Sequence, residues 1–271
     1  MVKTIRVNNS NIKYWFKDNN STETTLFIHG LCGDYRGLLE CSNYLKKQNI
    51  LILDLPGYGM SEPLSETHDL VGYASFISDF LKELNIKKIN LVGHSFGASV
   101  SLKFFDKFPE KLIRLVLISP IVSQSKTFSY KLGKLYFKIA SFFNDRLFHF
   151  LICNKLVVYL TDIFIIRTKN KDIKHQILKE DYVNYKRANS CAIRDSFYAI
   201  DLENFNFTNP SLISILVLIG KKDVLSSLDN MNLISKIPNI KVLIEQGGHL
   251  INQEKPGLVG KLLNDFLGQS R

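Results

Sequence analysis

A serine stands between two glycines in the segment GHSFGAS, residues 93–99, directly after the apolar run INLV. Where a strand ends in Gly-x-Ser-x-Gly and turns at once into a helix, the serine occupies a tight, strained turn with its hydroxyl exposed. Glycine is expected at 93 and 97 because a Cβ would collide with the neighbouring strand or helix. The pattern predicts a nucleophile at Ser95, with the backbone N–H of Phe96 directed at the space beside it.

A serine hydroxyl needs a base, and the base needs an orienting carboxylate. Asp223 follows the apolar run ILVLIG, and His249 follows KVLIEQ within the segment GGHL. Both lie at the carboxyl ends of predicted parallel strands, where sites gather in open α/β sheets. The chain order Ser95, Asp223, His249 therefore predicts His249 as the base and Asp223 as its partner.

Acyl transfer also needs donors for the oxyanion that forms when a serine attacks a carbonyl group. The glycines of the loop HGLCG, residues 29–33, let its backbone approach a substrate oxygen. The N–H of Leu31 is the expected partner of the Phe96 N–H. Losing one such donor typically costs about 3 kcal/mol of transition-state stabilisation.

Other residues near these motifs have structural interpretations. We expect His29 and His94 to hold loops by hydrogen bonds, because His249 already fills the role of base. Asp54 is interpreted as a loop anchor, and Cys32 as a buried structural thiol. The remaining histidines lack metal-ligand spacing, so the sequence predicts neither a metal site nor a cofactor.

Apolar runs alternate with helical patterns along most of the chain, and the runs are apolar on both faces. This alternation predicts an α/β fold with a mostly parallel, twisted, eight-stranded sheet covered by helices on both faces. The expected strands are 4–7, 12–16, 25–29, 50–53, 89–92, 115–118, 215–219 and 242–244. The expected helices are 38–48, 70–84, 96–108 and 256–267.

The alternation lapses between residues 121 and 205, where the sequence is helix-like and rich in Phe and Tyr. We expect a core domain formed by residues 1–120 and 206–271, with a helical lid (cap) insertion at 121–205. Two compatible interpretations apply to the insertion: it packs its apolar face on the core, and it forms a lid whose apolar underside lines a pocket. The side chains predicted to share one helical face are Leu132, Leu135, Tyr136, Ile139 and Phe143.

Five segments resemble the α/β-hydrolase fold superfamily, of the compact, lidded serine hydrolase (esterase/lipase) type. They are HGLCG (29–33), DLPGYGMS (54–61), GHSFGAS (93–99), GKKDVL (220–225) and GGHLINQEKP (247–256). The resemblance covers almost the whole chain. It implies a nucleophilic Ser95, the base His249 with its partner Asp223, and an oxyanion hole formed by Leu31 and Phe96. Ala98 stands where many relatives have glycine.

The expected reaction is hydrolysis of a carboxylic ester, thioester or lactone with an apolar acyl or alkyl group, through an acyl-enzyme. An aspartate in place of Ser95 would have indicated cleavage of an epoxide or a carbon–halogen bond. By resemblance, the scaffold also supports C–C bond hydrolysis, amide hydrolysis, haloperoxidase-type chemistry and acyl transfer. A catalytically inactive ligand-binding module is a further alternative, although such relatives have usually lost a triad residue.

The net charge of +10 comes from dispersed lysines with no nucleic-acid-binding motif, which indicates a solvated basic surface and no nucleic-acid partner. Four cysteines without a CxxC pair are typical of reduced thiols in a cytoplasmic protein. We expect no signal peptide, because residues 1–11 lack an apolar core, and no spanning helix. Weak peripheral contact between the basic, aromatic insertion and an anionic membrane stays open.

Overall fold

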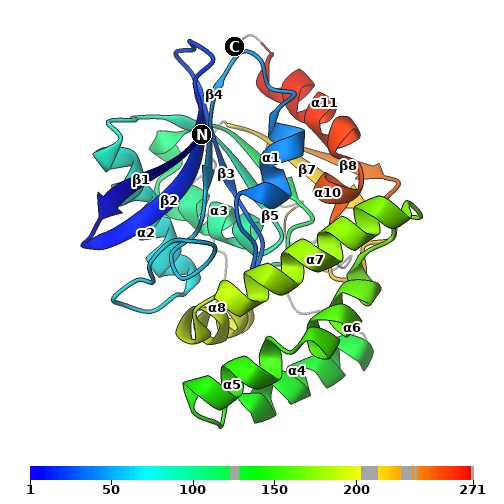
Figure 1. Cartoon of the computed structure of the whole chain (residues 1–271). Helices are drawn as coiled ribbons and strands as arrows, with labels where there is room; N and C mark the ends of the chain where they lie inside the picture. The colour runs from blue at the N-terminus through cyan, green and yellow to red at the C-terminus, as the bar shows by residue number, and fades with distance from the viewer. Residues whose placement is uncertain (123–127, 203–212, 227–233, 235–236, 270–271) are drawn as a thin grey trace.

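The computed structural model of the chain describes residues 1–122, 128–202, 213–226, 234 and 237–269. Within them, eight strands form one sheet in the order β1-β2-β4-β3-β5-β6-β7-β8 (Figure 1). β2 alone runs opposite to the other strands and is antiparallel to both β1 and β4. The predicted mostly parallel sheet is therefore confirmed. The strands are β1 Val2–Val7, β2 Ser10–Lys17, β3 Thr24–Ile28, β4 Asn49–Leu53, β5 Ile89–His94, β6 Leu112–Ile118, β7 Ser214–Gly220 and β8 Ile240–Glu245.

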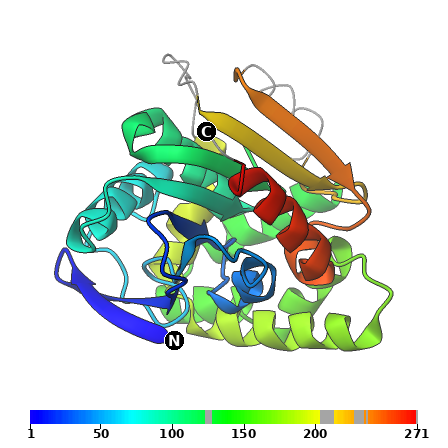
Figure 2. The same ribbon diagram turned by 90° about the horizontal axis from the view of Figure 1, so that it is seen from above.

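Helices cover both faces of this sheet, as the alternation predicts. Figure 2 shows α1 and α11 together on one side of the sheet; α2 and α3 cover the opposite side, and α8 packs against these two helices. The described helices are α1 Arg36–Ser42, α2 Leu70–Glu83, α3 Phe96–Lys107, the 3-10 helix η1 Pro109–Lys111, α4 Phe128–Ala140, α5 Asp145–Ile152, α6 Lys155–Ile165, α7 Lys171–Arg187, α8 Ser190–Leu202, α10 Ile251–Glu254 and α11 Pro256–Leu267.

The central strands are apolar on both faces because each face has its own core. In β3, Leu26 and Ile28 join the core beneath α2 and α3, whereas Phe27 joins the core beneath α1 and α11. Successive side chains of a strand point to opposite faces, so an uninterrupted apolar run fills both layers. The edge strand β8 departs from this rule and exposes Ile244.

The first helix after β3 is shorter than predicted. The helical pattern predicts residues 38–48, but α1 ends at Ser42 and the chain continues in turns. The side-chain amide of Asn19 donates hydrogen bonds to the carbonyls of Leu45 (3.2 Å) and Gln48 (2.7 Å). A residue far away in the sequence thus satisfies backbone carbonyls of the turns that follow α1.

The turn between β5 and α3 depends on two close backbone approaches, as the sequence predicts. A Cβ on Gly93 would lie 2.4 Å from the Gly97 carbonyl oxygen. A Cβ on Gly97 would lie 2.4 Å from the carbonyl oxygens of both Ile28 and His29. Since any side chain would push these segments apart, the two glycines allow β5, α3 and the end of β3 to meet at Ser95.

The described chain between β6 and β7 is helical and comprises α4 to α8. In Figure 1, α4, α5 and α6 lie on the far side of α7 and α8 from the sheet. The division into a core and a lid stays a prediction, and its expected boundary at 205 lies outside the described residues. No single described helix is long and apolar enough to cross a membrane, although α5 and α6, bent by 48°, meet the length and composition criteria together.

The apolar face predicted for residues 131–143 is exposed, so the interpretation that this face packs on the core is wrong. Between Lys131 and Ala140 of α4 the buried side chains are Phe137 and Ala140. The periodicity identified residues that share a face, but the neighbouring helices cover a different side of α4. The exposed members of the predicted face are Leu132, Leu135, Tyr136, Ile139 and Phe143.

We predict that Gly97→Ala lowers the free energy of unfolding by about 3 kcal/mol, the upper end of overpacking costs, because two backbone carbonyls would have to move. Gly133→Ala is the matched control. No atom lies within 4 Å of a Cβ at Gly133 in α4, so alanine there should leave stability unchanged or raise it by about 1 kcal/mol. Urea unfolding of both variants measures the difference. Equal stabilities would contradict the close approach at Gly97.

Candidate active site

Ser95 lies in the tight turn between β5 and α3. It caps α3 with φ 54° and ψ −118°, a conformation that residues with side chains rarely adopt and that costs about 1–3 kcal/mol. Its N–H donates to the Ile118 carbonyl at 2.9 Å, and its own carbonyl accepts from the Ala98 N–H at 3.0 Å. These bonds to β6 and α3 hold the strained backbone in place, so the strand–turn–helix geometry predicted for Ser95 is present.

The side chains of Ser95, His249 and Asp223 form one hydrogen-bonded series. Nε2 of His249 lies 2.8 Å from Oγ of Ser95. Nδ1 of His249 lies 3.0 Å from both carboxylate oxygens of Asp223. Asp223 follows β7 and His249 follows β8, so three separate strand ends contribute to the cluster. The predicted residues are therefore brought together, in contact order Ser–His–Asp.

The environment of Asp223 favours its ionised form. Burial raises the pKa of this carboxyl, but the neighbouring His249 and two backbone N–H groups together hold the pKa well below the usual range. The backbone N–H groups of Leu225 (2.9 Å) and Ser226 (3.0 Å) donate to Asp223 Oδ1 and act in the same direction. The buried, ionised carboxylate of Asp223 can thus face Nδ1 of His249 and hold the imidazole proton on that nitrogen.

Hydrogen bonds from the insertion and from α10 fix the loop that carries His249. The His249 N–H donates to the Ile165 carbonyl at the end of α6 (3.2 Å). Glu254 accepts from the Gly248 N–H (3.0 Å) and from the Arg167 N–H (2.6 Å). The imidazole position is therefore tied directly to the carboxyl end of α6.

The loop predicted to contain an oxyanion donor lies against Ser95. A Cβ on Gly30 would be 3.2 Å from Cβ of Ser95, and the Gly33 N–H closes a turn onto the Gly30 carbonyl at 3.0 Å. The interpretation of Leu31 and Phe96 as oxyanion donors stays a prediction. Cys32 is buried, as expected, and burial raises the pKa of its thiol well above the usual value.

The two flanking histidines hold loops, as predicted. His29 Nε2 accepts from the Leu55 N–H (2.9 Å), and its Nδ1 contacts the Gly30 carbonyl (2.7 Å). Nε2 of His94 lies 3.1 Å from the His249 carbonyl oxygen. Burial, followed by the nearby His249, lowers the pKa of His94 to about 3, so this ring is neutral at physiological pH.

Asp54 anchors the loop after β4, as expected. Its carboxylate accepts from the Tyr35 N–H (2.8 Å) and from the Met60 N–H (3.1 Å). Burial, together with the charge of Asp34, raises the pKa of Asp54 to about 7. The carboxyl therefore joins the loop after β3 to the loop after β4.

Two carboxyls of the insertion near the Cys32 loop were missed by the sequence analysis. Burial and the charge of Asp181 raise the pKa of Asp162 to about 9, and burial raises the pKa of Asp181 to about 7. Both carboxyls also contribute to the raised pKa of Cys32, after burial of the thiol. The available signal was a single aspartate within the apolar run VVYLTDIFII.

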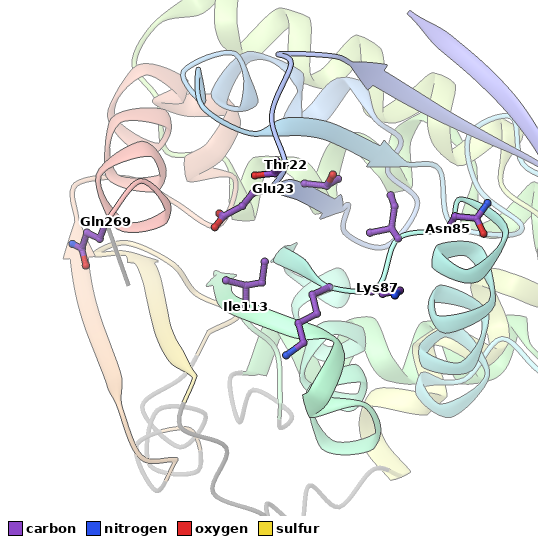
Figure 3. A pocket seen from close by; sticks show the side chains of 9 residues that line it. Thr22, Glu23, Asn85, Lys87, Ile113 and Gln269 are labelled. Atoms are coloured by element: carbon purple, nitrogen blue, oxygen red, sulfur yellow. The ribbon is translucent and has the colours of Figure 1, made fainter.

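A cavity of about 660 Å³ lies away from these residues (Figure 3). It opens at the amino ends of β3, β5 and β6, whereas Ser95 lies at the carboxyl end of β5. Its lining includes Glu23, Lys87 and Gln269. Because parallel sheets gather sites at their carboxyl edge, this cavity is not the site formed by the Ser–His–Asp series.

Comparison with protein families identifies one matching model, described as alpha/beta hydrolase fold, over residues 25–256. Among curated relatives, the dihydrolipoyllysine-residue acetyltransferase component of an acetoin cleaving system from Cupriavidus necator is 32% identical over 106 residues. That match covers 39% of this chain and 28% of the relative. The chain thus spans less than a third of that protein.

Two solved esterases share the fold over nearly the whole chain. The esterase EaEST from Exiguobacterium antarcticum has a TM-score of 0.80 at 16% identity, with 99% of this chain and 100% of that chain covered. A thermophilic esterase from Thermogutta terrifontis has a TM-score of 0.79 at 17% identity, with 99% and 98% covered. At such identities the likeness establishes the fold alone.

We predict that the buried, neutral His94 makes stability fall as the pH decreases from about 6.5 towards 3. In this window His94 binds a proton in the unfolded chain but not in the native one. The free energy of unfolding therefore falls by about 1.4 kcal/mol for each pH unit of acidification on account of this group. His94→Gln removes this group and should flatten the wild-type decline between pH 6 and 4 (roughly the middle of the window). Chemical unfolding at a series of pH values measures both slopes. Identical slopes would show that His94 ionises normally.

Proposed function

The chain belongs to the α/β-hydrolase fold family, and on that premise we propose that it is a serine hydrolase that cleaves carboxylic esters. The observation that carries the proposal is the contact of 2.8 Å between His249 Nε2 and Ser95 Oγ, in series with Asp223. A nucleophile, a base and an orienting carboxylate in mutual contact are the parts that acyl transfer requires.

In the proposed reaction, Nε2 of His249 removes the proton of Ser95 as Oγ attacks the carbonyl carbon of the ester. Asp223 keeps the other ring proton on Nδ1 and stabilises the imidazolium. The N–H groups of Leu31 and Phe96 receive the oxyanion. Collapse of this intermediate breaks the C–O bond, and His249 returns the proton to the departing alcohol. Water then hydrolyses the acyl-enzyme by the same steps and releases the acid.

An aromatic cluster supports a substrate with an apolar acyl or alkyl group. The rings of Phe137 and Phe197 stack with centroids 3.8 Å apart, and Phe148 contacts Phe137 edge-on at 5.4 Å. Phe137 and Phe148 belong to the apolar core that also contains Phe96, the residue after Ser95. Apolar walls with few polar groups are typical of sites for small organic ligands.

We also propose that the insertion acts as a lid. Ser95 is only 8% exposed and His249 is buried, so the described conformation leaves little room for a substrate at the hydroxyl. The bond between His249 and Ile165 joins the end of α6 to the site, and movement of α6 would open access there. Thioesters, lactones, amides and C–C bonds are alternative substrates for the same groups, and a substrate panel separates them.

We predict that Ser95→Ala lowers kcat for p-nitrophenyl esters by about 10³-fold or more, because no nucleophile replaces Oγ. Ser101→Ala is the matched control. Ser101 is also a buried serine of this region, but its hydroxyl donates to the Gly97 carbonyl (2.7 Å) and should be dispensable for turnover. Steady-state rates over graded acyl lengths give the comparison. Unchanged turnover in Ser95→Ala would refute the proposal.

Asp223→Asn should lower kcat by about 10⁴-fold while the fold is retained. An asparagine oxygen can still accept from Leu225 and Ser226, but its NH₂ group would face Nδ1 of His249 and favour the wrong tautomer. Circular dichroism checks the fold, and steady-state kinetics measure the loss. Wild-type activity would assign the orienting role to another group.

A further inference from the structure

Three helices of the insertion expose an unusual number of large apolar side chains. Of the twenty that are exposed in the described part of the chain, twelve lie between Leu132 and Phe164. Phe142 is 80% exposed, Phe150 66% and Leu156 63%. We call these twelve the α4–α6 outer face: Leu132, Leu135, Tyr136, Ile139, Phe142, Phe143, Leu147, Phe150, Leu156, Tyr159, Leu160 and Phe164.

The outer face is additional to the face that these helices use for packing. Phe137, Phe148 and Val158 are buried on the inner side of α4, α5 and α6. The Tyr136 hydroxyl of α4 donates to the Leu151 carbonyl of α5 (2.9 Å), a bond that joins two of these helices to each other. A helix on the surface of a water-soluble domain normally has one apolar stripe and a polar opposite side. A second apolar side on three consecutive helices indicates a surface that binds an apolar partner.

The charges beside the outer face have predominantly one sign. Residues 131–160 contain four lysines, one arginine and a single acidic residue, Asp145. Asp145 is already paired with Arg194 at 2.9 Å. Lys131, Lys138 and Lys155 are exposed. Apolar and aromatic side chains bordered by lysines are typical of helices that lie in the interface of an anionic bilayer.

We propose that the α4–α6 outer face docks on a lipid bilayer that contains anionic lipid. Lysine charge complements anionic headgroups, whereas a second copy of the chain would bring like charges together across the contact. Amphipathic helices of this kind lie in the plane of the interface with the apolar face among the acyl chains. The inference goes beyond the proposed function, because docking requires no chemistry at Ser95.

Docking would bring lipid against a helix whose end contacts the site. α6, which carries Leu156 and Phe164, ends at Ile165, whose carbonyl accepts from the His249 N–H. One continuous segment therefore joins the docking surface to the loop of His249. Contact of a bilayer with α6 would thus act on a segment that is hydrogen-bonded to the loop of His249.

The test is sedimentation of the full chain with phosphatidylcholine vesicles, with and without phosphatidylglycerol, in the Ser95→Ala background so that lipid is not consumed. We expect binding to the mixed vesicles that weakens with salt. The combined variant Phe142→Gln, Phe150→Gln and Leu156→Gln should bind about 10-fold or more weakly. These side chains are exposed, so the substitutions should leave folding intact, which thermal unfolding checks.

The matched control is Met60→Gln with Ile244→Gln, two side chains that are 61% and 65% exposed elsewhere. It should bind like the parent. Equal loss in control and test variants, or binding that only salt affects, would overturn docking through the outer face. Failure to bind either kind of vesicle would also overturn docking on lipid. This holds whether or not sedimentation equilibrium shows that the chain self-associates through these residues.

Discussion

The close contact of backbones at Gly93 and Gly97 is the constraint on which the site depends. It lets the end of β3, the end of β5 and the start of α3 meet within van der Waals distance. Ser95 is thereby held at φ 54°, with its hydroxyl directed at His249 rather than into the sheet. The strain of this turn is offset by the parallel strands around it, because a rigid sheet over-determines the turn geometry.

The remaining groups reach Ser95 because parallel strands end at one edge of the sheet. β7 and β8 are neighbours in register, so the loops that follow them carry Asp223 and His249 to adjacent positions. The loop after β3 lies against Ser95, and the end of α6 holds the His249 loop. The insertion is thus part of the support of the imidazole, which links any movement of α6 to the loop of His249.

The sheet and the Ser–His–Asp series were predictable because their signals are local. Apolar runs place the strands within a few residues, and each site residue follows such a run directly. The sequence patterns did not predict features that depend on contacts between distant residues. The turns after α1 are bonded to Asn19, 26 residues and more away, and neighbouring helices determine which side of α4 is covered. The burial of Asp162 likewise depends on tertiary packing, which a single aspartate in an apolar run does not specify.

The most direct test of the account is to label the chain with a fluorophosphonate and locate the adduct by peptide mass spectrometry. Such a reagent phosphonylates an activated serine hydroxyl and does not require the natural substrate to be known. A single adduct on Ser95 that disappears in His249→Ala, while the fold persists, is the predicted result. An unlabelled chain, an adduct on a different serine, or labelling of Ser95 that is independent of His249 would contradict the proposed nucleophile and base.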